Sequence, residues 1–395
     1  MDSKPGNDKG NRLPLYYAVT TFYWFSLYAY VPYVAPFAED LGANLRLIGL
    51  IAGVYGFTQM LLRIPLGIFS DAIRRRKIFA IIGVGFAAVG GVIVFLFPSP
   101  VTLLISRALG GVAASAWVTF MVLASSYYPR SETTRAVGYM NVANALGKMT
   151  ALMAGGLVAL WVGVPHVFLL GGLVGLAALL MSMGIVEKRP EFVASTAPRM
   201  TVLLEVARNR QLLCTSLLGI LLQFIVFATT FGFTPLAAVQ LHASEFQLGL
   251  LGVVGTLPGL FVAPLAGTVL PRKFGVKGTL IGGFVLCGLS AVLIPFCSVL
   301  WQLFIAQFIG STGGVVVLTL LMGLCIADVS SERRATAMGV FQAVYGIGMF
   351  LGPFTMGWIS HSFGFTAAFV FTGFVGLLGV VGLLFNIISE PAREG

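Results

Sequence analysis

Long apolar runs separated by short polar segments follow one another along almost the whole chain. A helix needs about 20 predominantly apolar residues to cross a bilayer. The runs that reach this length lie at 14–38, 47–70, 78–97, 101–127, 136–160, 166–186, 212–238, 247–270, 279–297, 300–327, 336–360 and 365–388. They lack the alternation over about ten residues that is typical of strands in a membrane β-barrel. The pattern therefore predicts an all-α membrane protein with twelve transmembrane helices.

The longest polar interruption lies between the sixth and seventh runs. It contains VEKRPEFVASTAPR, whose prolines and charged residues are typical of a linker. We therefore expect an amino-terminal six-helix bundle at 1–186, a cytoplasmic linker at 187–211 and a carboxy-terminal six-helix bundle at 212–395. The other loops are short, which leaves no room for a soluble catalytic domain.

The two expected bundles repeat each other at a shift of 200 to 201 residues. Gly49 matches Gly249 at the first shift, and Gly147 matches Gly348 at the second. Two parallel six-helix repeats, related by a pseudo-two-fold axis, are a known plan of secondary transporters. Such transporters bind their solute at the repeat interface near mid-membrane. The repeat therefore indicates a transporter.

Composition and charge agree with this interpretation. Only 10% of the residues are charged and 58% are hydrophobic, whereas soluble chains carry about 25% charged residues. Of 24 Lys and Arg residues, 20 lie in the termini and alternate loops, and the opposite loops contain only Arg46. This positive-inside bias predicts an integral protein of the plasma or inner membrane with both termini in the cytoplasm. The net charge of +10 then reflects topology and anionic lipid, so no nucleic-acid partner is expected.

Several classes of function are disfavoured by the residues present. The four cysteines lie in or at the ends of apolar runs, with neither a disulfide framework nor a zinc spacing. All three histidines fall at predicted outer helix ends, and the sequence shows no phosphate loop, metal cluster or nucleophilic triad. We therefore expect no enzyme activity, no cofactor and no metal. The expected partners are a small-molecule substrate and the lipid bilayer, with the protein as a monomer.

Three segments carry a resemblance to a known family. Residues 67–77, GIFSDAIRRRK, resemble the loop signature between helices 2 and 3 of the major facilitator superfamily, and residues 107–114, RALGGVAA, resemble its helix 4 signature. Residues 346–357, GIGMFLGPFTMG, resemble its glycine–proline helix signature, here on helix 11. The chain is identified as a member of this superfamily of secondary transporters. The resemblance implies two six-helix bundles that rock about a central site by alternating access.

The resemblance also implies gating residues. Asp71 is expected to hold the two halves together at the cytoplasmic face, against a helix amino terminus and nearby arginines. The alternative is a solvated loop acid within a basic cluster. On helix 11, glycine and proline are expected to permit bending. The expected gating residues are Gly67, Asp71, Arg75, Arg76, Gly352 and Pro353.

Three cations lie inside predicted helices: Arg63, Arg107 and Lys148. The 14 Asp and Glu residues all lie at termini, in loops or at helix ends, so no acid balances the cations at their depth. A buried cation without a counter-charge is costly, and a water-filled cavity or an anionic ligand relieves that cost. We therefore expect them to bind an anionic solute. The alternative is a structural role, with Arg63 snorkelling and Lys148 bonded to helix carbonyls or to Asn144. For Arg107, the family resemblance implies that it braces neighbouring helices.

Aromatic and amide side chains supply the other candidate ligands. Helix 1 carries Trp24 and Tyr28 on one face, and Tyr23 and Tyr30 on an adjacent face. Mid-membrane tyrosines and amides need hydrogen-bond partners, which a solute in a cavity offers. The remaining candidates are Asn144, Gln223, Gln307, Gln342 and Tyr345.

These observations predict a secondary active or facilitative transporter that moves a small organic or inorganic anion by alternating access. An aromatic and amide-rich cavity would also suit multidrug, sugar or lipid efflux, which stays the alternative. Residues 151–156, ALMAGG, lack the Gly-Pro that marks the family's drug/proton antiporters, and this weakens the drug-efflux alternative. No carboxylate lies mid-membrane, so no dedicated proton carrier is expected. Exchange, facilitated diffusion and proton movement with the substrate stay open.

Overall fold

The structure is a computed structural model that describes residues 13–73, 75–128, 132–187, 205, 208–330 and 333–385. Its first half contains α1 (Leu13–Tyr28), η1 (Val31–Tyr33), α2 (Val34–Asp40), α3 (Leu45–Ile73), α4 (Arg76–Leu96), α5 (Pro100–Ser115), α6 (Trp117–Ser125), α7 (Thr133–Val162) and α8 (Val164–Met183). Its second half contains α10 (Arg210–Ala228), η3 (Thr229–Phe233), α11 (Thr234–Gln240), α12 (Glu245–Thr256), α13 (Pro258–Leu293), η4 (Ile294–Phe296), α14 (Leu300–Leu324), α15 (Arg334–Phe363) and α16 (Phe365–Leu384). The predicted all-α membrane fold is confirmed.

Ten helices in the described part of the chain are long and apolar enough to cross a membrane. The longest of them, Glu245–Phe296, contains two of the predicted runs, which meet at Gly275 with φ 72° and ψ 161°. The first predicted run is not among the ten, because α1 ends at Tyr28 and the chain then continues through η1 into α2. These ten described helices agree with twelve predicted runs, because Glu245–Phe296 contains two runs and the interrupted first run adds one more.

The first membrane-spanning segment of each half is interrupted at a matching position. After α1 the chain forms the short η1, which contains Pro32, and after α10 it forms η3, a π-helical turn followed by Pro235. Proline removes a backbone donor and cannot continue the preceding helical hydrogen bonds. In membranes, such irregular backbone is tolerated where it is buried in protein or lines a cavity. Both breaks are buried in protein, at Pro32 and at Pro235.

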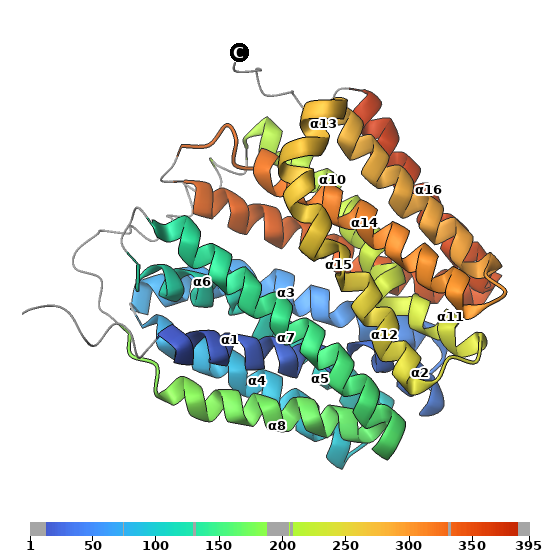
Figure 1. Cartoon of the computed structure of the whole chain (residues 1–395), viewed down its shortest axis with the longest axis horizontal. Helices are drawn as coiled ribbons and strands as arrows, with labels where there is room; N and C mark the ends of the chain where they lie inside the picture. Colours follow the sequence, from blue (N-terminus) through green and yellow to red (C-terminus); the bar gives the residue numbers. More distant parts are fainter. Residues whose placement is uncertain are drawn as a thin grey trace, which may run out of the picture.

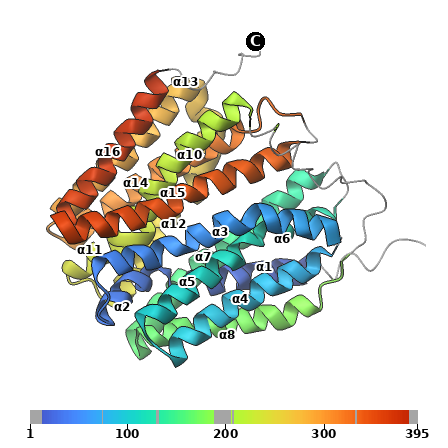
Figure 2. The same ribbon diagram turned by 180° about the vertical axis from the view of Figure 1, so that it is seen from behind.

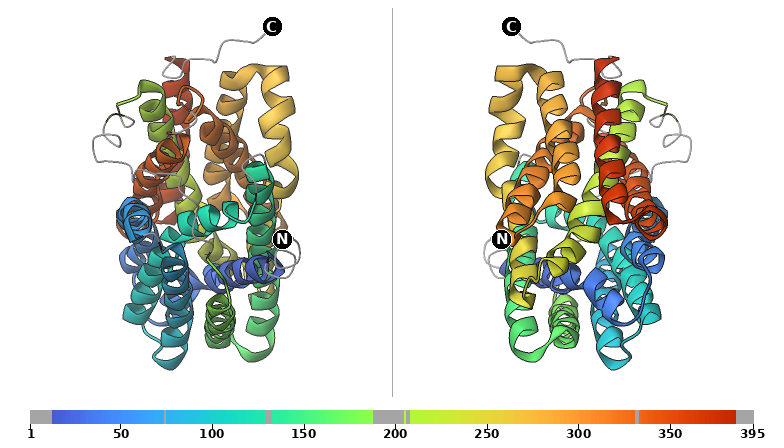
Figure 3. Two further views of the ribbon diagram at one scale, coloured as in Figure 1. Left: turned by 90° about the vertical axis from the view of Figure 1, so that its left-hand side faces the viewer. Right: turned by 90° about the vertical axis from the view of Figure 1, so that its right-hand side faces the viewer.

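The helices form two groups that meet at one end and separate toward the other. In Figure 1, α1 to α8 lie in the lower part and α10 to α16 in the upper part. Both views of Figure 3 show the same division. We call the end that carries α2 and α11 the closed end, and the end that carries Lys77 and Arg334 the basic end. One hydrophobic cluster joins the groups at the closed end, where Ile48 of α3, Leu248 of α12 and Met356 of α15 are buried together.

Glycines allow the two groups to pack closely at the closed end. Figure 2 shows α3 and α15 side by side between the groups. A Cβ on Gly53 of α3 would lie 2.7 Å from the carbonyl oxygen of Phe350 on α15. On the other side, a Cβ on Gly249 of α12 would lie 2.7 Å from the carbonyl oxygen of Leu152 on α7. Close backbone approach at small residues is a typical means of packing membrane helices.

The expected gating residues lie in different surroundings, and their role stays a prediction. Gly67 faces open space and Arg75 is exposed, whereas Gly352 and Pro353 lie in α15 against backbone of α10 and α3, respectively. The side chain of Asp71 lies outside the described residues. The backbone N–H of Arg76, at the start of α4, donates to Glu187 Oε1 at 2.6 Å. A carboxylate thus does cap a helix amino terminus at the basic end, and that carboxylate belongs to Glu187.

The packing of α3 on α15 leads to a stability prediction. Gly53→Ala should lower the melting temperature of the purified protein, because the added methyl group meets backbone and overpacking costs about 1–3 kcal/mol. Gly339→Ala in α15 is the matched control, because its Cβ would meet no atom within 4 Å. It should leave the melting temperature unchanged or raise it slightly, since Ala favours helices. Equal melting temperatures for the two variants would contradict the described packing.

Candidate substrate cavity

A cavity of about 440 Å³ lies between the two groups of helices. Both groups contribute to its walls. From the first group come Trp24, Tyr28, Tyr55, Gln59, Arg63, Trp117, Asn144, Ala145, Lys148 and Met149. From the second come Gln223, Val226, Phe227, Thr230, Phe231, Gly255, Thr256, Gly259, Leu260, Ser311, Gly314, Val315, Leu318, Met322, Gln342, Tyr345 and Met349. The volume lies within the range of about 300–1,000 Å³ that is usual for small-molecule sites.

The side chain of Lys148 extends from α7 to the rings of Trp24 and Tyr28 on α1, which we call the aromatic seat. Its Nζ lies 4.5 Å from the ring centroid of Trp24 and 4.5 Å from that of Tyr28. Those two rings are one helical turn apart, and Trp117 packs edge-on against Trp24 at 5.2 Å. The negative faces of aromatic rings attract an ammonium group. The rings therefore hold the Lys148 ammonium at the cavity wall.

Arg63 is the second cation at the wall. It follows Tyr55 and Gln59 on one face of α3 at intervals of four residues, and all three line the cavity. Only 5% of its surface is exposed, and its Nε has no hydrogen-bond partner. Sequence reasoning missed Tyr55 and Gln59. The four-residue spacing that leads to Arg63 was the signal that could have identified them.

No carboxylate from the described residues lines the cavity. The described ion pairs lie far from it at the basic end, where Arg135 pairs with Glu132 at 3.5 Å and Arg333 pairs with Glu205 at 2.9 Å. Several wall atoms are buried without a hydrogen-bond partner. These atoms are Trp24 Nε1, Gln59 Oε1, Arg63 Nε and Ser311 Oγ. Buried polar groups are normally paired, so the wall is suited to a ligand that carries both donors and acceptors.

The wall from the second group of helices is uncharged and combines apolar with polar side chains. Its polar side chains come from α10, η3, α12, α14 and α15. They are Gln223, Thr230, Thr256, Ser311, Gln342 and Tyr345. Both described cations of the cavity wall therefore come from the first group of helices, which is the uneven charge distribution expected from the sequence.

Four sequence-predicted ligands lie outside the cavity wall. Arg107 is 4% exposed, with its guanidinium carbon 4.6 Å from the ring of Tyr55. Tyr23 donates from its hydroxyl to the carbonyl of Ala113 at 2.5 Å. Tyr30 is fully buried and stacks on a phenylalanine of α8, and Gln307 is 2% exposed beside α12. These side chains fill space between helices, which is the structural alternative considered for Arg107.

Other wall residues depend on backbone breaks that the sequence signals weakly. Trp117 begins α6, directly after a turn at Ala116 that no glycine or proline marks. Thr230 and Phe231 lie in the π-helical η3. The ring centroids of Phe231 and Tyr28 lie 6.1 Å apart across the interface, so η3 of the second half contacts α1 of the first.

Comparison with known proteins identifies the family. The model of the Major Facilitator Superfamily matches residues 16–272 and 217–395. An uncharacterised MFS-type transporter of Methanocaldococcus jannaschii is 24% identical over 89% of this chain and 92% of its own. Multidrug resistance protein MdtG of Citrobacter koseri is 25% identical over 72% of this chain and 70% of its own. These matches extend across both halves of the chain.

A solved structure supports the fold independently. The crystal structure of a bacterial homolog to the human lysosomal transporter Spinster, in an inward-facing and occupied conformation, superposes with a TM-score of 0.80. The alignment covers 99% of this chain and 100% of that chain at 17% identity. At this identity the similarity shows a shared fold.

The uneven charge of the cavity predicts a bias in chemical reactivity. In a chain with Cys214→Ala and Cys297→Ala, an Asn144→Cys thiol should react faster with a sulfonated methanethiosulfonate than with its trimethylammonium counterpart. A positive local potential concentrates anions, so the rate ratio, relative to a free thiol in solution, should rise about tenfold. Lys148→Gln should remove most of this bias. A ratio equal to that of the free thiol would contradict a positive cavity.

Proposed function

Because the chain belongs to the major facilitator superfamily of membrane transporters, we propose that it moves a small organic anion across the membrane by alternating access. One observation carries this proposal: Arg63 and Lys148 line a cavity to which no described residue contributes a carboxylate. The burial of an unpaired ion costs several kcal/mol. An anion bound between the two groups of helices would remove much of this cost.

The aromatic seat offsets only part of the free-energy cost of burying the Lys148 ammonium. A desolvated cation–π contact contributes on the order of 2 kcal/mol, and Lys148 has two such contacts. Arg63 has no aromatic contact of this kind among the described residues and retains an unpaired Nε. A counter-charge is therefore favoured at both cations, since the described rings relieve the cost only in part at Lys148 and not at all at Arg63.

The wall residues favour an organic ion over a bare inorganic one. Trp24, Tyr28, Tyr55 and Phe227 present ring surface to the cavity, and Met349 adds a flexible apolar contact. Such surface contributes through the burial of apolar area, at about 25 cal/mol per Å². A fully hydrated inorganic anion would gain nothing from these groups, whereas a carboxylate or sulfonate on an apolar body would use both kinds of wall.

Alternating access would require the closed end to open. The proposal treats 1–186 and 212–395 as units that rock about the cavity, joined by 187–211. In the closed end, backbone contacts at Gly53 and Gly249 would have to separate. The positive-inside bias supports a basic end that faces the cytoplasm, so that the cavity would be open to the cytoplasm in this structure.

A second candidate function is multidrug efflux. Relatives that include Multidrug resistance protein MdtG favour it, as do the aromatic residues of the cavity wall. This function would require binding of neutral or cationic amphiphiles, for which Arg63 and Lys148 would be unfavourable neighbours. The charge of the bound ligand therefore distinguishes the two functions.

The proposal predicts ligand-dependent stabilisation that follows charge. Naphthalene-2-sulfonate should raise the melting temperature of the purified protein, whereas 2-naphthalenemethanol and 2-naphthylmethylammonium should not. Arg63→Gln and Lys148→Gln should each weaken binding of the sulfonate by about 10–100-fold, since a hydrogen bond to a charged group contributes about 1.5–3 kcal/mol. Lys273→Gln, outside the cavity, is the matched control and should bind normally. Stabilisation by the ammonium alone would favour multidrug efflux instead.

A further inference from the structure

The internal repeat predicts two equivalent seams between the groups of helices, but the structure packs them differently. One seam joins α3 to α15, and the other joins α7 to α12. The repeat exchanges α3 with α12 and α13, and α7 with α15. Both seams are closed near the closed end, where the glycine contacts lie. They differ from the middle of the membrane toward the basic end.

The α3–α15 seam stays packed well beyond mid-membrane. A Cβ on Gly56 would lie 2.5 Å from Cβ of Met349, and a Cβ on Gly346 would lie 2.8 Å from Cβ of Met60. Further along α3, Ile64 and Ile68 pack against the hydrophobic cluster that contains Phe341 of α15. Side chains therefore close this side of the cavity along most of α3.

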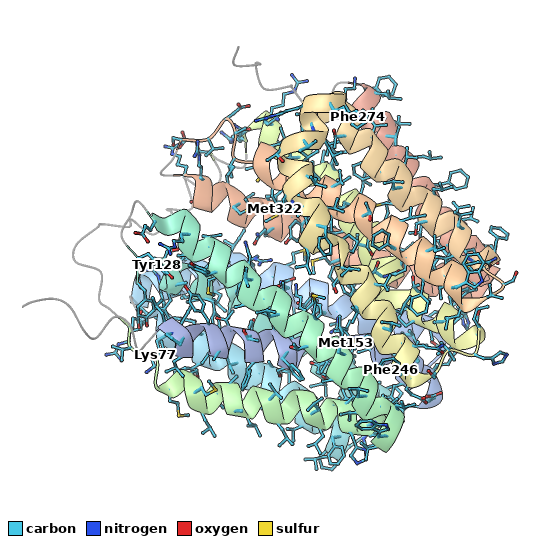
Figure 4. All side chains as sticks on the ribbon, viewed as in Figure 1. Lys77, Tyr128, Met153, Phe246, Phe274 and Met322 are labelled. Carbon is cyan, nitrogen blue, oxygen red and sulfur yellow. The ribbon has the colours of Figure 1, made fainter. Side chains whose placement is uncertain are left out.

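The α7–α12 seam opens at mid-membrane. It is closed where a Cβ on Gly156 would lie 3.3 Å from the ring of Phe246 and one on Gly252 would lie 2.7 Å from Leu152. Figure 4 labels Met153 and Phe246 in this region. Beyond Leu152, α7 turns Lys148 toward the cavity. In Figure 1, α7 and α13 diverge from this point.

Equivalent positions explain why only one seam closes. At a shift of 201 residues, Lys148 of α7 corresponds to Met349 of α15. Methionine packs against a neighbouring helix, whereas an ammonium group cannot be buried there without a partner. At a shift of 200, Gly56 corresponds to Thr256, which is too large for the close approach that Gly56 allows.

The edges of the open seam are apolar and face outward. On α7, Leu146 is 53% exposed, next to Ala145 of the cavity wall. On α13, Leu260 is 43% exposed and also lines the cavity, and a Cβ on Gly259 would meet no described atom within 4 Å. Apolar side chains at this depth contact acyl chains of the bilayer. Residues that line the cavity on α7 and α13 therefore lie next to, or are themselves, side chains exposed on the outer surface.

We propose that the gap between α7 and α13 is a side portal from the bilayer, and that the substrate is an anionic amphiphile with its charged head at Lys148 and its apolar tail between Leu146 and Leu260. The inference rests on the proposed transport of an organic anion and narrows its substrate class. Charge complementarity at Lys148 and apolar edges outside it fit the two parts of one such molecule. A water-soluble anion would interact with Lys148 but would gain nothing from the apolar edges.

The portal can be tested without a ligand. In the Cys214→Ala, Cys297→Ala background, a bimane label at Ala145→Cys should be quenched by phosphatidylcholine with brominated acyl chains in nanodiscs. The matched control is Gln342→Cys, on the far wall of the cavity, whose label should be quenched at least about threefold less. Lys148→Met, which copies the α3–α15 seam, should reduce quenching at position 145. Equal lipid quenching at both sites, or none at position 145, would overturn the portal.

The substrate class can be tested with dodecyl phosphate, ethyl phosphate and dodecyl maltoside added to the protein in phosphatidylcholine nanodiscs. Dodecyl phosphate should bind at least about tenfold more tightly than ethyl phosphate, and it should also bind more tightly than dodecyl maltoside. Lys148→Gln should abolish the advantage of dodecyl phosphate over dodecyl maltoside. Equal binding of ethyl and dodecyl phosphate would overturn the amphiphile and leave the proposed anion transport standing. Binding of dodecyl maltoside alone, or of none of the three, would overturn both.

Discussion

The ammonium of Lys148 is the constraint on which the central part of this molecule depends. It lies at mid-membrane, where an unpaired charge costs several kcal/mol, and no described carboxylate faces it. Two aromatic rings of α1 at 4.5 Å reduce that cost. These contacts fix α1 against α7 and keep the ammonium at the cavity wall. The same charge prevents α7 from packing on α13 as α15 packs on α3. In this interpretation, the Lys148 ammonium gives the wall its charge, holds the rings of α1 against α7 and keeps α7 apart from α13.

The closed end follows the opposite principle, in which small residues bring backbones together without charge. Gly53 and Gly249 allow contact with carbonyl groups of the other half, and a hydrophobic cluster joins both halves at this end. Arg46 is the exception, with its guanidinium carbon 4.2 Å from the ring of Trp358 at the same end. Packing of this kind is dense and either fully made or fully broken. A molecule sealed by it at one end is suited to switching between two states rather than to gradual opening.

The sequence predicts the fold far better than it predicts the site. Hydropathy locates the helices because bilayer thickness fixes their length, and the missing counter-charges identify Arg63 and Lys148 as unusual. The rotation of each helix is harder to predict. Trp24 and Tyr23 are neighbours on α1, yet one lines the cavity and the other bonds to α5. A helical wheel gives adjacent faces and does not say which face meets the cavity, since tertiary packing decides that. For Arg107, the deciding contact is the ring of Tyr55.

The repeat explains both what could be predicted and what could not. Equivalent sequences predict two equivalent seams, and a symmetric molecule would give a cavity walled equally on both sides. The exchange of Met349 for Lys148 breaks that equivalence at one position. Because an apolar side chain there closes a seam and a charged one cannot, one substitution changes the wall charge and the lateral access together. In the proposed transport, the charge that would attract an anion and the gap that would admit an apolar tail therefore have the same cause. They would be expected to appear, or be lost, as one property rather than as two.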